Sequence, residues 1–474
     1  MASRKKNVNI KLWWYFYFKL ITMRLLYIFL LFPALGWSQL TDELAESLRL
    51  ELQEAVELNN IEGVSAAVIF PNGDVWKDAY GLISETDSIT TEHHLYSGST
   101  TKTLVSASIL QLQEEGQLSI EDSLGMYIGP FDNINGAITL KQLLEHTSGI
   151  YNYTDHEDFF NTVFVAPNNL WTTSEILSFV NEPIFSPGDD WSYSNTNYVL
   201  LSMIIESVTQ GMLADDFQSR FFEPLNMDQT FLGAYQNEIG PYGGMWLDAN
   251  GNGSLDEFST WNTTALLSGA WGAGGLSTVP ADLAHWAKTL YGTNEVLNAQ
   301  SFEQLTTGSI HQQAYGLGVV LGSYGGCTML GHGGGIIHTT EMRYFVEEDF
   351  SAVMIINGGQ YDFSDYLDIV DKVKEALIMS SSIELTNENS QVYPNPFDHV
   401  LHIELPNASA LISIDFYDIT GRLLTSFDSN NLNVTNQKIS IIGERVAPLF
   451  EGKVLYKLTT NEGVQTGLLF KEGF

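Results

Sequence analysis

The chain has 474 residues, of which 57 are acidic and 21 are basic, so its formal net charge at neutral pH is −36. So acidic a chain is repelled by phosphate backbones and anionic lipid surfaces, which argues against nucleic-acid binding. The length allows two or three domains. The single cysteine, Cys327, excludes an internal disulfide, so the protein depends on its hydrophobic core for stability.

The first 38 residues have the composition of a secretory signal peptide. They carry six basic residues and no acidic one, and an apolar run covers residues 25–35. That run is shorter than the roughly 20 residues that a membrane span needs, which disfavours a retained anchor. We therefore expect cleavage near Ser38 and an exported mature chain without an integral membrane span. The signal itself begins at either Met1 or Met23.

The next part of the chain predicts a helix, a β-hairpin and a second helix. An amphipathic helix is expected over residues 41–59. Two short strands, 64–70 and 75–81, flank a Pro-Asn-Gly-Asp turn that favours positive φ. Apolar residues at helical spacing then follow Ser99 and end at Gly116, a suitable C-cap.

Helices are expected in the middle of the chain and strands later. The predicted helices cover residues 140–144, 196–210, 217–225 and 281–291. The later strands cover residues 316–322, 327–330, 342–345 and 351–356, before a helix at 362–379. One strand pair early and several strands late predict an α+β domain whose sheet joins both ends of the domain.

The segment 151–190 is aromatic, rich in asparagine and irregular, which is typical of loops that flank a cleft. Within it, Tyr151 and Tyr153 either line the substrate cleft or cover the core. Residues 381–391 are polar and are expected to form a linker. Short alternating strands with turn signals then predict a small all-β domain over residues 392–474.

Ser99 and Lys102 stand three residues apart at the start of a predicted helix. Residues at this spacing share one helix face, so the hydroxyl and the amine can meet as a nucleophile and its base. A lysine acts as a base only where burial or a nearby cation lowers its pKa. The same Ser-x-x-Lys pattern occurs at Ser3 and Lys6, so alone it equally fits a capping serine beside a solvated lysine.

Two other stretches resemble parts of the same kind of site. Tyr193 and Asn195 form a Tyr-x-Asn pattern before a predicted helix. His332 and Gly334 form a His-x-Gly pattern between two predicted strands.

In this order and at these separations, the three motifs resemble those of the β-lactamase-related serine hydrolases. That group holds class C β-lactamases, D,D-peptidases, D-aminopeptidases and some esterases. Supporting matches are Leu143-Leu144-Glu145-His146-Thr147-Ser148-Gly149, Phe185-Ser186-Pro187-Gly188, Phe222-Glu223-Pro224-Leu225-Asn226-Met227 and Gly274-Gly275-Leu276-Ser277-Thr278. The resemblance implies a β-lactamase/transpeptidase-like fold over residues 39–380, with an antiparallel sheet flanked by helices and a helical lobe.

The resemblance also implies a role for each motif residue. Ser99 is the nucleophile that becomes acylated, while Lys102 and Tyr193 share the proton transfers, and either of them is the general base. Asn195 orients Lys102 and binds the substrate amide.

His332 and Gly334 support the substrate, and the backbone N–H groups of Ser99 and Gly335 form the oxyanion hole. Loss of one such donor typically lowers the rate about 10²–10³-fold. The resemblance requires no cofactor.

His332 occupies a position where such enzymes more often have lysine. A histidine is only partly charged near neutral pH, so it is less suited to binding a substrate carboxylate. This favours an esterase or a D-amino-acid peptidase-like amidase over a β-lactamase or D,D-carboxypeptidase. An alternative of another class is a catalytically silent cell-surface binding protein on the same fold.

The C-terminal segment carries a second resemblance. The stretches Val392-Tyr393-Pro394-Asn395-Pro396-Phe397 and Phe416-Tyr417-Asp418-Ile419-Thr420-Gly421-Arg422 resemble the sorting domains of the type IX secretion system. The resemblance implies a β-sandwich over residues 392–474 that engages the type IX secretion machinery. The protein is then secreted, or attached to the outer surface of a Gram-negative bacterium.

One loop resembles a calcium-binding loop of the EF-hand type. Asp248, Asn250, Asn252 and Asp256 stand at ligand positions, with glycine where the template requires it. The final bidentate glutamate is missing because Ser259 occupies its position. The loop is either a structural calcium site or a turn rich in asparagine and glycine. His93, His94 and His338 lack a third ligand at a telling spacing, and are expected to be surface or packing residues.

Overall fold

A computed structural model describes the chain from residue 40 onward. It covers residues 40–380 except 60, 237–239, 248–254, 259–260 and 359–362, together with the strands of the segment 391–471. The predicted signal peptide therefore lies outside the described residues, as does the predicted linker except for Gln391, which belongs to a strand.

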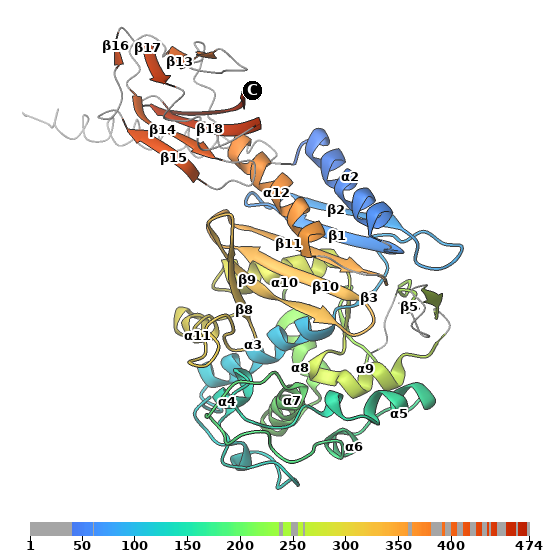
Figure 1. Ribbon diagram of the computed structural model, residues 1–474. Coiled ribbons are helices and arrows are strands. Elements are labelled where there is room, and N and C mark those ends of the chain that lie inside the picture. Colours follow the sequence, from blue (N-terminus) through green and yellow to red (C-terminus); the bar gives the residue numbers. More distant parts are fainter. Residues whose placement is uncertain are drawn as a thin grey trace, which may run out of the picture. The chain divides into compact units, whose positions relative to one another are not determined.

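A six-stranded antiparallel sheet forms the centre of the first domain (Figure 1). Its strands, in spatial order, are β2 (Val75–Gly81), β1 (Gly63–Ile69), β11 (Phe350–Ile356), β10 (Thr339–Phe345), β9 (Cys327–Gly335) and β8 (Val320–Tyr324). Strand β1 pairs with β2 on one edge and with β11 on the other, where Val64 lies opposite Ile356. The prediction that early and late strands share one sheet is confirmed.

Helices cover both faces of this sheet, which is why β1 is buried along its whole length. Alternate side chains of a strand point to opposite faces. Val64 and Val68 pack with α2 (Asp42–Leu58) and α12 (Phe363–Ser380). Ala67 and Ile69 face the other core, to which α10 (Pro280–Gly292) contributes. The sheet is thus the middle layer between two cores.

The remaining helices form a lobe beside the second core. They are α3 (Thr101–Glu114), α4 (Leu140–Leu144), α5 (Phe159–Val165), α6 (Thr173–Leu177), α7 (Asn195–Thr209), α8 (Leu213–Phe217), α9 (Thr264–Ala270) and α11 (Ala299–Leu305). Every residue of α3 from Thr101 to Leu110 is buried, including the polar ones. Helix α3 is therefore a central helix, and its first turn is enclosed by other elements.

The short strands complete this domain. Strands β3 (Leu95–Tyr96), β7 (Leu276–Thr278) and β4 (Phe231–Leu232) form a three-stranded sheet, and β5 (Trp246–Leu247) pairs with β6 (Asp256–Glu257).

Local signals predicted several element boundaries correctly. Gly73 in the hairpin turn and Gly116 after α3 both have positive φ, at 90° and 72°. Thr139 caps α4 through a reciprocal capping box with Gln142.

Other predicted element extents were wrong. The strand expected at 342–345 begins at Thr339, and the helix expected at 217–225 is replaced by α8, which ends at Phe217, and a π-helix over Gln218–Phe222. Strand β8 begins at Val320 rather than at residue 316, because Gly318 turns at φ 77° directly against Ser106 and Tyr198. Strand β9 extends to Gly335, so the His-x-Gly motif lies within a strand and not between strands. The segment 151–190 contains the short helices α5 and α6.

The C-terminal segment forms two four-stranded antiparallel sheets, as expected for a small all-β domain. One has the order β12 (Gln391–Tyr393), β13 (Val400–Glu404), β17 (Lys438–Ile442) and β16 (Val434–Thr435). The other has the order β15 (Leu423–Asp428), β14 (Leu411–Tyr417), β18 (Gly452–Thr460) and β19 (Gly463–Lys471). Within the described part of the chain, no helix has the length and apolar character needed to cross a membrane.

Candidate active site

Ser99 lies in a short 3-10 turn, Gly98–Thr100, that leads from β3 into α3. Gly98 has φ 56°, a conformation that favours glycine. The Thr101 hydroxyl donates to the Gly98 carbonyl over 2.7 Å and accepts from the Leu276 N–H. The turn is thereby fixed from both sides, and Ser99 is presented at the start of the central helix.

Lys102 reaches back to Ser99 from the first turn of α3 and is fully buried. Its Nζ lies 3.0 Å from Ser99 Oγ, 2.8 Å from Asn195 Oδ1 and 2.5 Å from the Ala273 carbonyl oxygen. These neighbours are all uncharged. Burial therefore lowers the pKa of the Lys102 amine well below its usual range.

Tyr193 contacts Ser99 from the other side. Its hydroxyl lies 2.9 Å from Ser99 Oγ, and its ring lies 4.9 Å from Lys102 Nζ. Burial raises the pKa of the Tyr193 phenol above its usual range, although the hydrogen bond with Ser99 acts in the opposite direction. The phenol is consequently protonated at neutral pH.

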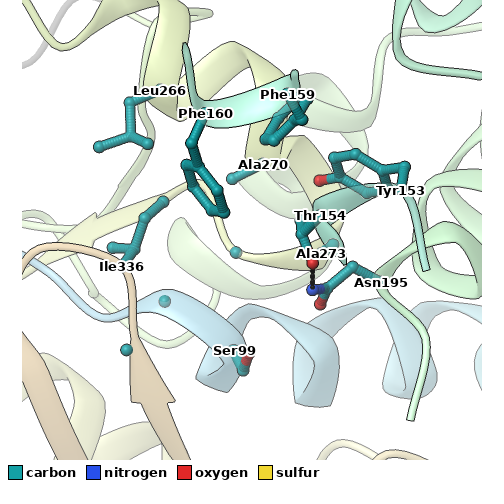
Figure 2. Close-up of a pocket in the computed structure, with 13 residues that line it drawn as sticks. Ser99, Tyr153, Thr154, Phe159, Phe160, Asn195, Leu266, Ala270, Ala273 and Ile336 are labelled. Carbon is teal, nitrogen blue, oxygen red and sulfur yellow. Dashed lines mark hydrogen bonds between the residues drawn. The ribbon is translucent and has the colours of Figure 1, made fainter. Parts of the chain in front are cut away.

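Asn195 is the first residue of α7, and the side-chain amide is held at both ends. Oδ1 accepts from Lys102. Nδ2 donates to Thr154 Oγ1 over 3.1 Å, and Figure 2 shows this second hydrogen bond. The backbone N–H of Asn195 donates to Asn152 Oδ1 over 3.0 Å. These contacts determine which end of the Asn195 amide faces the Lys102 amine.

His332 lies on β9 and is buried beneath the site, with an exposed fraction of 5%. Burial, reinforced by the charge of Lys102, lowers the pKa of His332 to about 3. The expectation that this histidine is partly charged near neutral pH is therefore wrong, because the sequence did not reveal its burial.

Two glycines allow β9 to approach the Ser99 turn closely. A side chain at Gly334 would place its Cβ 1.9 Å from the Ser97 carbonyl oxygen. A side chain at Gly98 would lie 2.8 Å from the Gly335 nitrogen. Only glycine fits this packing of backbone on backbone, which brings Gly335 to the same cavity as Ser99.

A cavity of about 190 Å³ opens beside Ser99. Its walls combine apolar and polar side chains, and Figure 2 shows the apolar Phe160, Leu266 and Ile336 across from Ser99. No charged side chain lines it among the residues that the structure describes. Its lining residues are Gly98, Ser99, Tyr153, Thr154, Phe159, Phe160, Asn195, Leu266, Ala270, Ala273, Gly274, Gly335 and Ile336. Lys102, Tyr193 and His332 are not among these lining residues, and Lys102 and Tyr193 contact the Ser99 hydroxyl from behind it.

A family model described as Beta-lactamase matches residues 49–373, which is more than half of the chain. The chain belongs to the beta-lactamase family. A second model, described as a secretion system C-terminal sorting domain, matches residues 391–468. The chain therefore carries a type IX secretion sorting domain, which indicates export to the cell surface or the medium.

Curated relatives of this beta-lactamase family member include Protein flp of Staphylococcus aureus. It is 28% identical over 262 residues, which cover 53% of this chain and 49% of that protein. The putative penicillin-binding protein PbpX of Bacillus subtilis is 28% identical over 231 residues, covering 48% of this chain and 54% of that one. The chain spans about half the length of the curated relatives it matches.

Solved structures with the same fold include a D-stereospecific amidohydrolase from a Streptomyces species. It is 26% identical, with a TM-score of 0.60 over 68% of this chain and 97% of that chain. A D-amino acid amidase from Ochrobactrum anthropi is 23% identical, with a TM-score of 0.61 over 71% and 99% of the two chains. The latter likeness shows the fold alone.

Several site residues of this family member were not identified from the sequence. Phe160, Leu266 and Ile336 line the cavity but come from three distant segments, and the Ala273 carbonyl is a backbone contact of Lys102. The only signal in the sequence for the Ala273 carbonyl was the glycine-rich stretch around it, residues 272–275, which allows the backbone to approach another group closely. For Tyr153 both alternatives hold, because it lines the cavity while its hydroxyl donates to the Gly269 carbonyl in the core.

The predicted calcium loop lies mostly outside the described residues. Asp248, Asn250 and Asn252 are not among the described residues, whereas Asp256 lies in β6, which pairs with β5. The calcium site stays a prediction.

His94 and His338 are buried and hydrogen-bonded. His94 Nε2 lies 2.9 Å from Gln229 Oε1. His338 accepts from the Tyr96 N–H at Nδ1 and lies 2.9 Å from the Gly244 carbonyl at Nε2.

Proposed function

We propose that the first domain is a serine hydrolase that forms an acyl-enzyme on Ser99 and cleaves an ester or amide of an uncharged acyl group. The observation that carries this proposal is the position of Ser99 Oγ, within 3.0 Å of Lys102 Nζ and 2.9 Å of the Tyr193 hydroxyl, beside a cavity without a charged lining residue among those described.

Lys102 is the better supported general base. A neutral amine has two N–H donors and one lone pair. Asn195 Oδ1 and the Ala273 carbonyl can accept the two donors, and the lone pair then accepts the Ser99 proton. Burial lowers the pKa of Lys102 and raises that of Tyr193, so at neutral pH the amine is nearer its basic form than the phenol.

The reaction then proceeds in two steps, acylation and deacylation of Ser99. Ser99 Oγ attacks the substrate carbonyl as its proton passes to Lys102, and the Tyr193 hydroxyl protonates the leaving amine or alkoxide. Lys102 returns its proton to Tyr193. In the second step a water molecule attacks the acyl-enzyme and gives its proton to the Tyr193–Lys102 pair. That pair returns a proton to Ser99 Oγ as the acid is released. The N–H groups of Ser99 and Gly335 stabilise the oxyanion in both steps.

The lining of the cavity supports the substrate class. A free carboxylate on the substrate would need a cation, and the described lining residues offer none. Phe159, Phe160 and Leu266 suit an aromatic or branched apolar acyl group. The likeness to a D-stereospecific amidohydrolase supports an amide of a D-amino acid with an acylated, uncharged amino group as one such substrate.

Two alternatives make different predictions. A β-lactamase or D,D-carboxypeptidase is supported by the relative PbpX, a putative penicillin-binding protein, but such substrates carry a carboxylate. A silent binding protein has no need of a neutral lysine beside the serine.

We further propose that residues 1–38 are removed on export and that residues 392–474 engage the type IX secretion machinery of a Gram-negative bacterium. No cofactor is required by the chemistry above.

Intact mass spectrometry tests the reaction. The protein from residue 39 onward is mixed separately with a fluorophosphonate, a neutral aryl ester and a penicillin, beside Ser99→Ala as the control. We expect an adduct of the fluorophosphonate that Ser99→Ala abolishes, and turnover of the ester but not the penicillin. Folded protein without any adduct would leave the binding protein, and rapid penicillin turnover would favour the β-lactamase.

A further inference from the structure

Three buried side chains form a hydrogen-bonded row behind the active site. His146 Nε2 lies 3.2 Å from the Tyr315 hydroxyl, which lies 2.9 Å from His332 Nε2. The other ring nitrogen of His332 contacts the carbonyl oxygen of Gly333. The proposed reaction uses neither His146 nor Tyr315, and both are buried.

The direction of each hydrogen bond follows from the two ends of the row. The Ser194 N–H donates to His146 Nδ1 over 3.1 Å, so a neutral His146 carries its proton on Nε2 and donates it to Tyr315. A carbonyl oxygen only accepts, so His332 carries its proton on Nδ1 and donates it to Gly333.

Tyr315 can then satisfy both neighbours. Its oxygen accepts from His146, and its single proton goes to His332 Nε2. This assignment gives each hydrogen bond of the row one donor and one acceptor when both histidines are neutral. The Tyr198 hydroxyl also contacts Tyr315 and donates its own proton to the Leu144 carbonyl. Burial lowers the pKa of both His146 and His332.

Other groups that face His332 do not supply a counter-ion. They are the Tyr193 ring, whose centre lies 6.4 Å from that of the His332 ring, and Arg343, whose charge disfavours a protonated imidazole. Arg343 is itself paired with Glu341 over 2.7 Å. A second proton on His332 would have Tyr315 as its nearest partner, which already uses its proton toward this ring.

The row ends on the strand that completes the active site. Gly333 precedes Gly334, whose backbone packs directly against Ser97 and Ser99, and Gly335 follows at the cavity. The hydrogen bond to the Gly333 carbonyl therefore holds the strand one residue before Gly334, where the strand packs against Ser97 and Ser99.

We propose that Tyr315 and His146 are positioning residues that hold His332 as its neutral Nδ1–H tautomer, and that His332 in turn fixes the glycine strand that presents the Gly335 N–H beside Ser99. In this role His332 is a structural support of the oxyanion hole and not a group that binds a substrate carboxylate. The effect on rate rests on the proposed function, whereas the tautomer does not.

The first test is nitrogen NMR of the histidine rings in the wild-type protein, with the His332 signals assigned by their loss in His332→Asn. We expect a protonated Nδ1 and an unprotonated Nε2 that persist from neutral pH down to about pH 5. Protonation at Nε2, or at both nitrogens, would overturn the proposal even if the protein proves inactive.

The second test compares two Tyr→Phe variants during hydrolysis of a neutral aryl ester. Tyr315→Phe removes the donor to His332 and keeps the ring. Tyr291→Phe is the matched control, since Tyr291 is equally buried and its hydroxyl has no partner among the described residues. We expect Tyr315→Phe to lower kcat and kcat/KM together by about tenfold, as for the loss of one positioning hydrogen bond, and Tyr291→Phe to change either by less than about twofold.

His146→Gln and His146→Leu provide a rescue test, with folding checked by thermal unfolding. Glutamine keeps an N–H donor for Tyr315 and should retain most of the rate, whereas leucine should match Tyr315→Phe. An unchanged rate in both Tyr315→Phe and His146→Leu, or an increase in KM alone, would overturn the positioning role. Failure of Ser99 labelling in the wild-type protein would instead overturn the proposed function.

Discussion

Lys102 and Lys374 are buried to the same depth, with exposed fractions of 0% and 1%, but in different electrostatic surroundings. Lys374 on α12 lies 2.8 Å from the carboxylate of Glu348. Lys102 on α3 has three uncharged neighbours instead. A buried amine with a counter-ion remains a cation, whereas one without a counter-ion loses affinity for its proton. The absence of a counter-ion leaves nothing to oppose the effect of burial on the Lys102 amine, as the proposed role of a general base requires.

Removal of the Lys102 amine should therefore change the acylation rate far more than removal of the Lys374 amine. We expect Lys102→Met to slow acylation by the fluorophosphonate about 10³-fold, since general-base catalysis typically contributes 10²–10⁴-fold. Lys374→Met should leave the rate within about twofold. The rate of mass gain measures both. Equal losses in the two variants would show that Lys102 acts through folding.

A counter-ion can also be added to the active-site lysine. Asn195→Asp places a carboxylate at the position of Oδ1, 2.8 Å from Lys102 Nζ, and creates a pair like that of Lys374. The amine would then stay protonated at neutral pH, so we expect acylation to slow roughly 10²-fold at pH 7 and to recover as the pH rises. A pH profile of acylation measures this. A profile that matches the wild type would argue against the lysine as the base.

The stability of the protein should depend on pH through Lys102. Its folded-state pKa is lowered, so between that value and about 10.4 the unfolded chain binds more protons and stability rises with pH. Lys102→Met removes this penalty. We expect the variant to exceed the wild type by about 1–3 kcal/mol near neutral pH and the gap to shrink toward pH 10. Chemical unfolding at several pH values measures the gap, and a constant gap would contradict the argument.

The smallest effect should come from the counter-ion of Lys374. The Glu348 side chain is 27% exposed, so water screens part of the pair. We expect Glu348→Gln to lower the free energy of unfolding by about 1 kcal/mol and to leave acylation unchanged. Thermal and chemical unfolding measure the free energy of unfolding, and the rate of mass gain measures acylation. A slower acylation would show that the two lysines are coupled.

Features encoded by neighbouring residues were predictable from the sequence. The cap at Thr139, the turn at Gly73 and the start of α3 near Ser99 each depend on a few consecutive residues. The motif order also placed Ser99, Lys102, Tyr193 and Asn195 together by resemblance.

Features that depend on distant contacts were not predictable. The full burial of Lys102 depends on the Ala273 carbonyl, 171 residues away, and the neutral state of His332 depends on its enclosure by Tyr315 and the sheet. Neither neighbour stands near its partner in sequence. The residues that line the cavity were not predictable for the same reason, because α5, α9 and the end of β9 meet there only in the folded domain.

The pairing of β1 with β11 has a consequence for the biogenesis of the protein. Val64 meets Ile356 across the centre of the sheet, so β1 has its second partner only after nearly 300 further residues have emerged from the ribosome. Contacts this far apart in sequence form slowly. A nascent chain therefore cannot complete its central layer while it is being made, and this delay would leave the chain unfolded long enough for export across the inner membrane.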